Sequence, residues 1–179
     1  LCGLLHDVGR FEQLRRYGTF NDAESIDHAA MSARVLFEEG RVRDYLDDPS
    51  RDGLLRTAVA WHSAYRLPAE LDGRTRMFCQ ILRDADKVDI LRVNVEVPME
   101  EIYNVSTEAL RQSPVTPEVL QAFYGHHCVL RSLKRFPADN AVGHASLVFE
   151  LCYPANPATA EAFAAMRAEM HRWLAEKLP

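Results

Sequence analysis

Two adjacent residues near the start of the chain combine an imidazole with a carboxylate. His6 and Asp7 follow an apolar run that includes Leu1, Leu4 and Leu5. Both side-chain types are good ligands of divalent metal ions, and neighbouring positions on one rigid helix can reach one ion from two directions. An ion held in this way could acidify a water molecule and turn it into a nucleophile. A His-Asp pair alone is common, so the hypothesis of a metal site depends on further polar residues downstream.

His28 lies beside the apolar stripe of a helix predicted between residues 21 and 40. Asn21 or Asp22 can cap this helix, and a glycine at position 40 can end it. Asp27 can orient the imidazole of His28, or it can simply favour the helix N-terminus. The residues alone leave His28 open as a metal ligand or as a surface or capping residue.

His62 and Asp86 occupy the core faces of two later predicted helices. His62 shares a face with apolar residues of a helix that begins near Asp52, so it must find hydrogen-bond partners or bind an ion. Asp86 aligns with apolar residues of a helix predicted over 74–94, where a carboxylate is costly to bury unless it is paired or metal-bound. Asp84 points roughly 160° away on the same helix and is therefore the alternative to Asp86.

The order of these residues, His-Asp, His, His and Asp on separate helices, resembles the HD-domain superfamily of metal-dependent phosphohydrolases. The segments that carry the resemblance are LLHDVGR, DHAAMSARVL, VAWH and DADKVD, between Leu1 and about Asp89. The resemblance implies an all-α, HD-domain-like helical bundle. It also implies one or two divalent ions, of Mn, Fe, Co, Ni or Zn, bound by a set of five residues: His6, Asp7, His28, His62 and Asp86. The family pattern begins with one more histidine, so we expect a further helix upstream of Leu1.

The implied reaction is hydrolysis of a phosphate ester of a nucleotide or another small phosphorylated metabolite by metal-activated water. Asp7 is the expected bridge between two ions. Arg10, Arg15 and Lys87 are candidates for binding the substrate phosphate, for which the bidentate geometry of Arg is well suited. Arg10 and Lys87 are also predicted to take part in catalysis. The alternative for these three residues is a solvated surface role.

Two other functions stay open. The first is a di-iron oxygenase on the same scaffold, which a pair of redox-active irons would indicate. The second is a non-catalytic HD-like module that binds a ligand, which absence of the upstream histidine would favour. His126 and His127 do not add a metal site, because adjacent residues on a helix point about 100° apart and no other ligand set accompanies them.

Composition limits the class of protein. The chain has 179 residues, 47% hydrophobic and 26% charged, as in ordinary soluble proteins. This length suits one domain, with a metal-binding core over 1–95 and further helices packed on it over 96–179.

The net charge of -5 disfavours a broad nucleic-acid surface but is compatible with a small phosphorylated ligand. No window approaches a membrane span. Four scattered cysteines, without CxxC spacing, predict reduced thiols in a cytoplasmic protein.

The elements that must position the candidate ligands are predicted to be helices almost throughout. The first should bury Leu1, Leu4, Leu5, Val8 and Phe11 on one face, with Gly3 allowing another element to approach closely above Asp7. An apolar helix is predicted over 141–153, and a last helix runs from Asn156 through Trp173. We expect these C-terminal helices to cover the motif bundle and to complete a substrate pocket or a dimer face.

Overall fold

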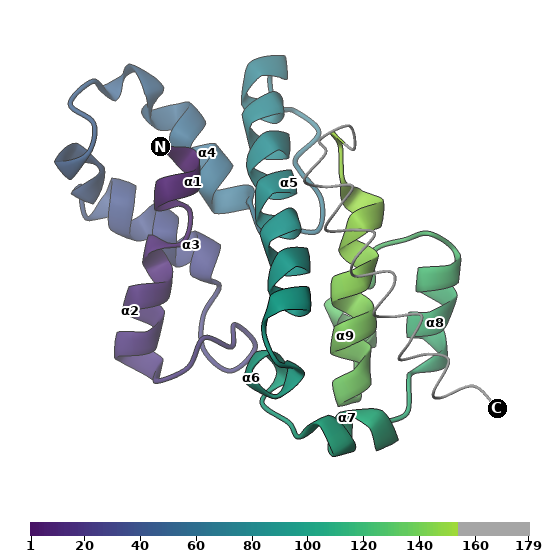
Figure 1. Cartoon of the computed structure of the whole chain (residues 1–179). Coiled ribbons are helices and arrows are strands. Elements are labelled where there is room, and N and C mark those ends of the chain that lie inside the picture. The colour runs from purple at the N-terminus through teal and green to yellow at the C-terminus, as the bar shows by residue number, and fades with distance from the viewer. Residues whose placement is uncertain (154–179) are drawn as a thin grey trace. The chain divides into compact units, whose positions relative to one another are not determined.

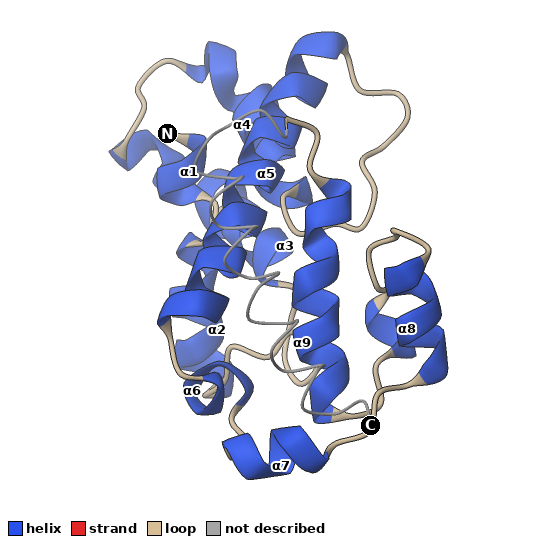
Figure 2. Ribbon diagram, turned by 45° about the vertical axis from the view of Figure 1, so that its right-hand side comes forward, coloured by secondary structure: helices blue, strands red, loops and turns tan. Residues whose placement is uncertain are grey.

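The computed structural model describes residues 1–153 and contains helices and loops but no strand in that range (Figures 1 and 2). The prediction of an all-α protein is confirmed. The chain divides into two compact units, Leu1–Arg83 and the part from Asp84 onward, and the boundary lies within the long helix α5 (Gly73–Glu96). None of the described helices is long and apolar enough to cross a membrane. The helix predicted from Asn156 to Trp173, and His171 within it, lie outside the described residues.

Short helices joined by tight turns build the first unit. In chain order they are α1 (Cys2–Leu5), α2 (Val8–Tyr17), α3 (His28–Ala33), the π-helix η1 (Arg34–Glu38), the 3-10 helices η2 (Arg41–Asp44) and η3 (Pro49–Arg51), and α4 (Asp52–Trp61). Their buried apolar side chains form one cluster of Leu5, Leu36, Val42, Leu55 and Val59. A second cluster, of Ala58, Cys79 and Leu82, joins α4 to the first half of α5.

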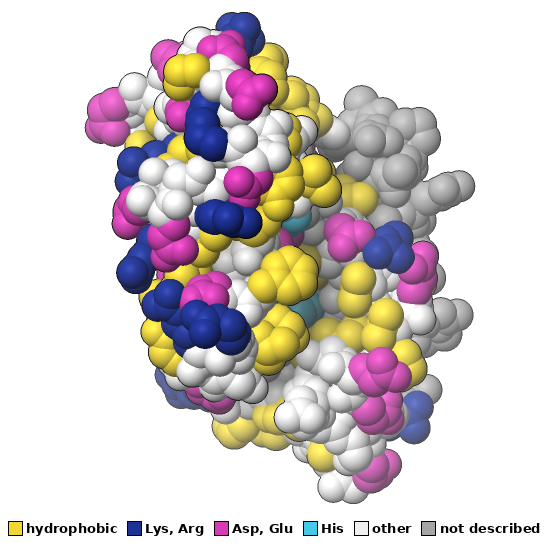
Figure 3. Space-filling model, turned by 90° about the vertical axis from the view of Figure 1, so that its left-hand side faces the viewer, with side chains coloured by type: hydrophobic (Ala, Val, Ile, Leu, Met, Phe, Trp, Pro, Cys, Tyr) yellow, Lys and Arg dark blue, Asp and Glu magenta, His cyan; other side chains and the backbone are white. Residues whose placement is uncertain are grey.

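The prediction that one helix buries the face of Leu1, Leu4, Leu5, Val8 and Phe11 is wrong. Leu5 is 1% exposed, but Leu4 is 73% and Phe11 79% exposed. The chain turns at His6 and Asp7, so α1 and α2 are separate helices and one helical period does not run through both. Exposed hydrophobic side chains therefore lie among the charged ones at the surface, as the yellow areas of Figure 3 illustrate.

The close approach of two helices occurs at Gly9, not at Gly3. A Cβ atom built on Gly9 would lie 2.4 Å from the backbone nitrogen of Ser32 and 2.6 Å from the carbonyl oxygen of His28, whereas one on Gly3 would meet nothing within 4 Å. The amide of Gly9 also donates to Ser32 Oγ at 2.9 Å. Glycine therefore lets α2 lie directly against α3.

Helix α3 begins later than the sequence predicts. Its N-cap is Asp27, whose carboxylate accepts hydrogen bonds from the amides of Ala29 and Ala30. Asn21 and Asp22 lie in the preceding turns, so neither caps this helix. Gly40, the predicted end of the helix, has a φ of +76° and follows η1.

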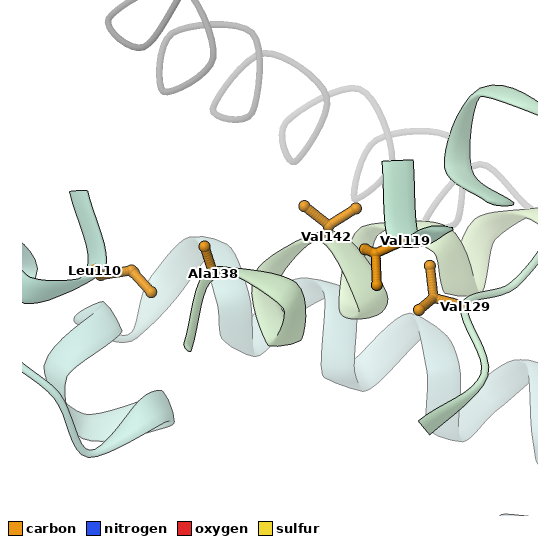
Figure 4. Close-up of a cluster of buried hydrophobic side chains, with 5 residues drawn as sticks. All are labelled: Leu110, Val119, Val129, Ala138 and Val142. Atoms are coloured by element: carbon orange, nitrogen blue, oxygen red, sulfur yellow. The ribbon is translucent and has the colours of Figure 1, made fainter. Parts of the chain in front are cut away.

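The second unit contains the rest of α5 and a series of short helices around their own apolar cluster. These helices are α6 (Met99–Tyr103), α7 (Thr107–Gln112), α8 (Pro117–Tyr124), η4 (Arg131–Leu133), α9 (Pro137–Ala145) and η5 (Ser146–Glu150). The buried cluster consists of Leu110, Val119, Val129, Ala138 and Val142 (Figure 4). The apolar segment predicted as one helix over 141–153 is thus the end of α9 followed by a 3-10 turn, because the α-helical bonding pattern stops at Ala145.

Candidate metal centre

Four of the predicted ligands come together in the first unit. Nε2 of His28 lies 3.1 Å from Nε2 of His62. Oδ1 of Asp7 lies 3.5 Å from the His28 nitrogen and 3.4 Å from the His62 nitrogen. Nε2 of His6 is 3.7 Å from the other carboxylate oxygen of Asp7. The turn between α1 and α2 supplies His6 and Asp7, the start of α3 supplies His28, and the end of α4 supplies His62.

Hydrogen bonds on the far side of each ring determine which nitrogen carries the proton. Nδ1 of His6 lies 2.8 Å from the Gly3 carbonyl oxygen, Nδ1 of His28 lies 2.6 Å from Asp22 Oδ2, and Nδ1 of His62 lies 2.7 Å from the Val59 carbonyl oxygen. A carbonyl or ionised carboxylate oxygen can only accept, so each Nδ1 must donate. In the neutral imidazoles, Nε2 of each ring is then left with a lone pair, the form in which histidine binds a metal ion.

Three lone-pair atoms thus face one another without a donor between them. Oδ1 of Asp7 is a buried side-chain atom with no hydrogen-bond partner, the only such atom in residues 1–153. Nε2 of His28 and Nε2 of His62 lie 3.5 Å and 3.4 Å from it. A proton on one imidazole could satisfy only one pair of these atoms, whereas a cation between them would satisfy all three. The donor set of imidazole nitrogens and a carboxylate oxygen suits Mn, Fe, Co, Ni or Zn.

The side chain of Asp7 faces this site and does not cap its own helix. Asp7 is the N-cap residue of α2, yet its side chain makes no capping hydrogen bond, although an Asp cap normally contributes about 1 kcal/mol. Asp27 and Asp48, which occupy the same position on α3 and η3, do cap their helices.

The end of α4 that carries His62 is held by a buried arginine. Arg83 is 6% exposed, and its guanidinium donates to the carbonyl oxygens of Trp61, Ala64 and Tyr65. The guanidinium thus binds carbonyl groups at and just beyond the last turn of α4, of which that of Trp61 also accepts the Ala64 amide at 3.3 Å. His62, which lies between them in sequence, is 2% exposed, as the prediction of a core-facing histidine requires.

A polar network on α2 surrounds the outer side of His28. Asp22 Oδ1 accepts from Gln13 Nε2 at 2.9 Å and from Arg10 Nη1 at 3.0 Å, while Oδ2 faces His28. Gln13 is completely buried, and its amide group also donates to the carbonyl oxygen of Ile26. Burial raises the pKa of Asp22, but the hydrogen bonds from His28 and Gln13 outweigh this effect and lower the pKa to about 2.

The residues predicted to bind phosphate have partners within the protein. Nη1 of Arg10 donates to Gln13, Asp22 and the carbonyl oxygen of Phe20, and its Nε lies 3.8 Å from Asp7 Oδ2. Arg15 is an exposed residue that pairs with Glu12. The substrate roles of these two arginines stay predictions, and the geometry brings only Arg10 next to the cluster.

Asp86 and Lys87 belong to the second unit, so their roles as closing ligand and phosphate contact also stay predictions. Lys87 is 7% exposed. Asp84, the alternative to Asp86, has another role: its two oxygens accept the backbone amides of Cys152 and Tyr153 at 2.7–3.1 Å. These hydrogen bonds offset the cost of burying the Asp84 carboxylate on α5, so its burial does not require a metal ion.

The remaining histidines of the described chain lie outside this cluster. His126 is exposed, has a φ of +57° and stacks on Phe149. His144 is half-buried in the second unit, where Nδ1 lies 3.1 Å from both the Tyr103 hydroxyl and the Asn94 amide nitrogen. Burial, with the nearby positive charge of Lys134, lowers the pKa of His144 from 6.5 to about 4.

The depressed pKa of His144 predicts that acid weakens the fold. The unfolded chain binds a proton at this residue below pH 6.5, whereas the folded chain does so only below about pH 4. The contribution of neutral His144 is therefore complete above pH 6.5 and is lost as the pH falls through this window, by up to about 3 kcal/mol. Urea unfolding of wild type and His144→Gln across the window should show a flatter dependence in the variant. Parallel curves would contradict the assignment.

Sequence reasoning missed Asp22 as the partner of His28, as well as Gln13, Ser32 and Arg83. A signal for Gln13 exists, because it lies one turn after Gly9 on the buried face of α2. Arg83 carries no such pattern. Comparison of the chain with protein-family models, with curated proteins and with solved structures gave no match.

Proposed function

We propose that the first unit is the metal-binding part of a metal-dependent phosphohydrolase that acts on a nucleotide or another small phosphorylated metabolite. The observation that carries the proposal is the group of three acceptor atoms, Asp7 Oδ1, His28 Nε2 and His62 Nε2, within 3.1–3.5 Å of one another and without a donor. His6 supplies a fourth potential metal ligand beside Asp7. Groups of this kind are unfavourable in a folded protein unless a cation joins them.

A divalent ion at these four residues would lower the pKa of a bound water toward neutrality and polarise a phosphoryl oxygen. The chain itself contributes the orientation of the ligands and the local charge. Asp7 supplies the negative charge of the ligand set, and each histidine is held as its Nδ1–H tautomer by an oxygen acceptor. Arg10 adds a positive charge 3.8 Å from Asp7, which favours the approach of an anionic ester. The net charge of -5 is compatible with a substrate recognised by such a local group.

The test begins with the metal-free full chain. Mn²⁺, Fe²⁺, Co²⁺, Ni²⁺ and Zn²⁺ are added separately, and the melting temperature and the bound metal after desalting are measured. An ion present at about 100 times its Kd should stabilise the fold by about 2.7 kcal/mol. Release of phosphate from nucleoside phosphates and sugar phosphates is then followed with and without a chelator. We expect hydrolysis that requires the metal and disappears with the chelator.

A matched control for this test is His126→Asn. His126 is exposed and outside the cluster, and asparagine tolerates its left-handed backbone. This variant should bind metal and hydrolyse esters as wild type does, whereas Asp7→Ala should do neither while keeping its helical content. Failure of wild type to retain any of the five metals would refute the metal site. Retention of two irons without hydrolysis of any ester would favour an oxygenase, and retention of metal without turnover would favour a binding module.

A further inference from the structure

We infer that Asp22 is a positioning residue, which keeps His28 in the tautomer that can bind a metal ion. The inference rests on the metal site proposed above, but its main observable is a property of the metal-free protein. Asp22 is outside the set of four ligands and lies six residues before His28, in the turn that precedes α3. Its side chain is only 10% exposed, and that of His28 only 6%.

The two carboxylate oxygens of Asp22 contact different groups. Oδ1 accepts from two donors on α2, Gln13 Nε2 and Arg10 Nη1. Oδ2 is thereby directed at Nδ1 of His28, 2.6 Å away. A carboxylate can only accept in this contact, so the proton of the neutral imidazole stays on Nδ1 and the Nε2 lone pair faces Asp7 and His62.

Asparagine at position 22 is expected to reverse the tautomer. The two donors, Gln13 and Arg10, require an acceptor at the Oδ1 position, so the amide oxygen of asparagine would occupy it. The amide nitrogen would then face Nδ1 of His28 and donate to it. Nδ1 would have to accept, and the ring proton would move to Nε2, the atom that the metal ion needs.

Asp27 provides a matched control because it is close to the same imidazole. A carboxylate oxygen of Asp27, one of Asp22 and a ring nitrogen of His28 lie within 4.8 Å of one another. The Asp27 carboxylate, however, accepts from the amides of Ala29 and Ala30 and caps α3. Asparagine caps a helix about as well as aspartate does, so Asp27→Asn removes the same charge without placing a donor against His28.

The experiment compares wild type, Asp22→Asn and Asp27→Asn as metal-free full chains. Long-range ¹H–¹⁵N spectra report the tautomer of His28, assigned by its absence in His28→Gln, and circular dichroism checks that each variant is folded. We expect the Nδ1–H form in wild type and Asp27→Asn, and the Nε2–H form in Asp22→Asn. The affinity for Mn²⁺ and for Zn²⁺, measured by competition with a chelator, should fall roughly 10- to 100-fold in Asp22→Asn alone.

The outcomes separate this inference from the proposed function. A folded Asp22→Asn that keeps the Nδ1–H form would overturn the role of Asp22, whether or not wild type binds metal. Equal loss of metal affinity in both variants would also overturn it, since charge alone would then explain the effect. A tautomer change in a protein whose wild type retains none of the five metals named above would support the positioning role and refute the proposed metal site.

Discussion

Asp7→Asn is expected to abolish metal binding and, at the same time, to make the metal-free protein more stable. In wild type, Oδ1 of Asp7 faces the lone pairs of His28 and His62 with no donor among the three atoms. Asparagine can turn its amide nitrogen to the two imidazoles and its oxygen to Arg10, whose Nε lies beside Oδ2. A repulsive contact would then become a hydrogen bond worth about 1 kcal/mol. The melting temperature of the metal-free variant should rise by roughly 2–4 °C.

Calorimetry of the metal-free proteins and elemental analysis after metal loading would measure the two effects. Asp7→Ala is the matched comparison, because it removes the same charge but supplies no donor. Both variants should lose the metal, and only Asn should gain stability over wild type. If metal-free Asp7→Asn melted at or below the temperature of Asp7→Ala, the arrangement of lone pairs would be incorrect. Metal content equal to wild type in Asp7→Asn would remove Asp7 from the ligand set.

Gly9→Ala is expected to destabilise the first unit strongly and to displace the site. The new methyl group would lie 2.4 Å from the Ser32 backbone nitrogen and 2.6 Å from the His28 carbonyl oxygen. Because both neighbours are backbone atoms of α3, the two helices must separate, which also weakens the bond from the Gly9 amide to Ser32 Oγ. Overpacking and the weakened hydrogen bond together should cost about 2–4 kcal/mol. Metal affinity should fall as well, since His28 moves with α3.

Gly3→Ala is the control for this substitution. Gly3 lies within α1 and has no atom within 4 Å of an added Cβ, so alanine should leave stability unchanged or raise it by up to about 1 kcal/mol. Chemical unfolding of the two variants beside wild type would measure the difference. A Gly9→Ala protein as stable as Gly3→Ala would show that α2 and α3 are not in close contact.

Local sequence patterns were sufficient to predict part of this structure. The all-α class follows from apolar residues at helical spacing. The start of α4 at Asp52 and the core position of His62 also follow from that spacing, because both depend on residues a few positions apart. Gly40, which has a positive φ, follows the end of a helical segment, as its residue type predicts. Local pattern failed at the first helix, where the turn at His6 and Asp7 left Leu4 and Phe11 exposed.

The sequence by itself determined which residue types were available for metal chemistry and that His6, Asp7, His28 and His62 would lie on helices or at their ends. Only the tertiary structure decided that these four side chains meet, that Gly9 rather than Gly3 is the point of close approach, and that Asp22 rather than Asp27 holds His28. The physical reason is distance along the chain. Hydrogen bonds such as those of Asp22 with Gln13 and Arg10 join residues 9 and 12 positions apart. These hydrogen bonds depend on the packing of α2 on α3, so the spacing of residues within one helix cannot predict them.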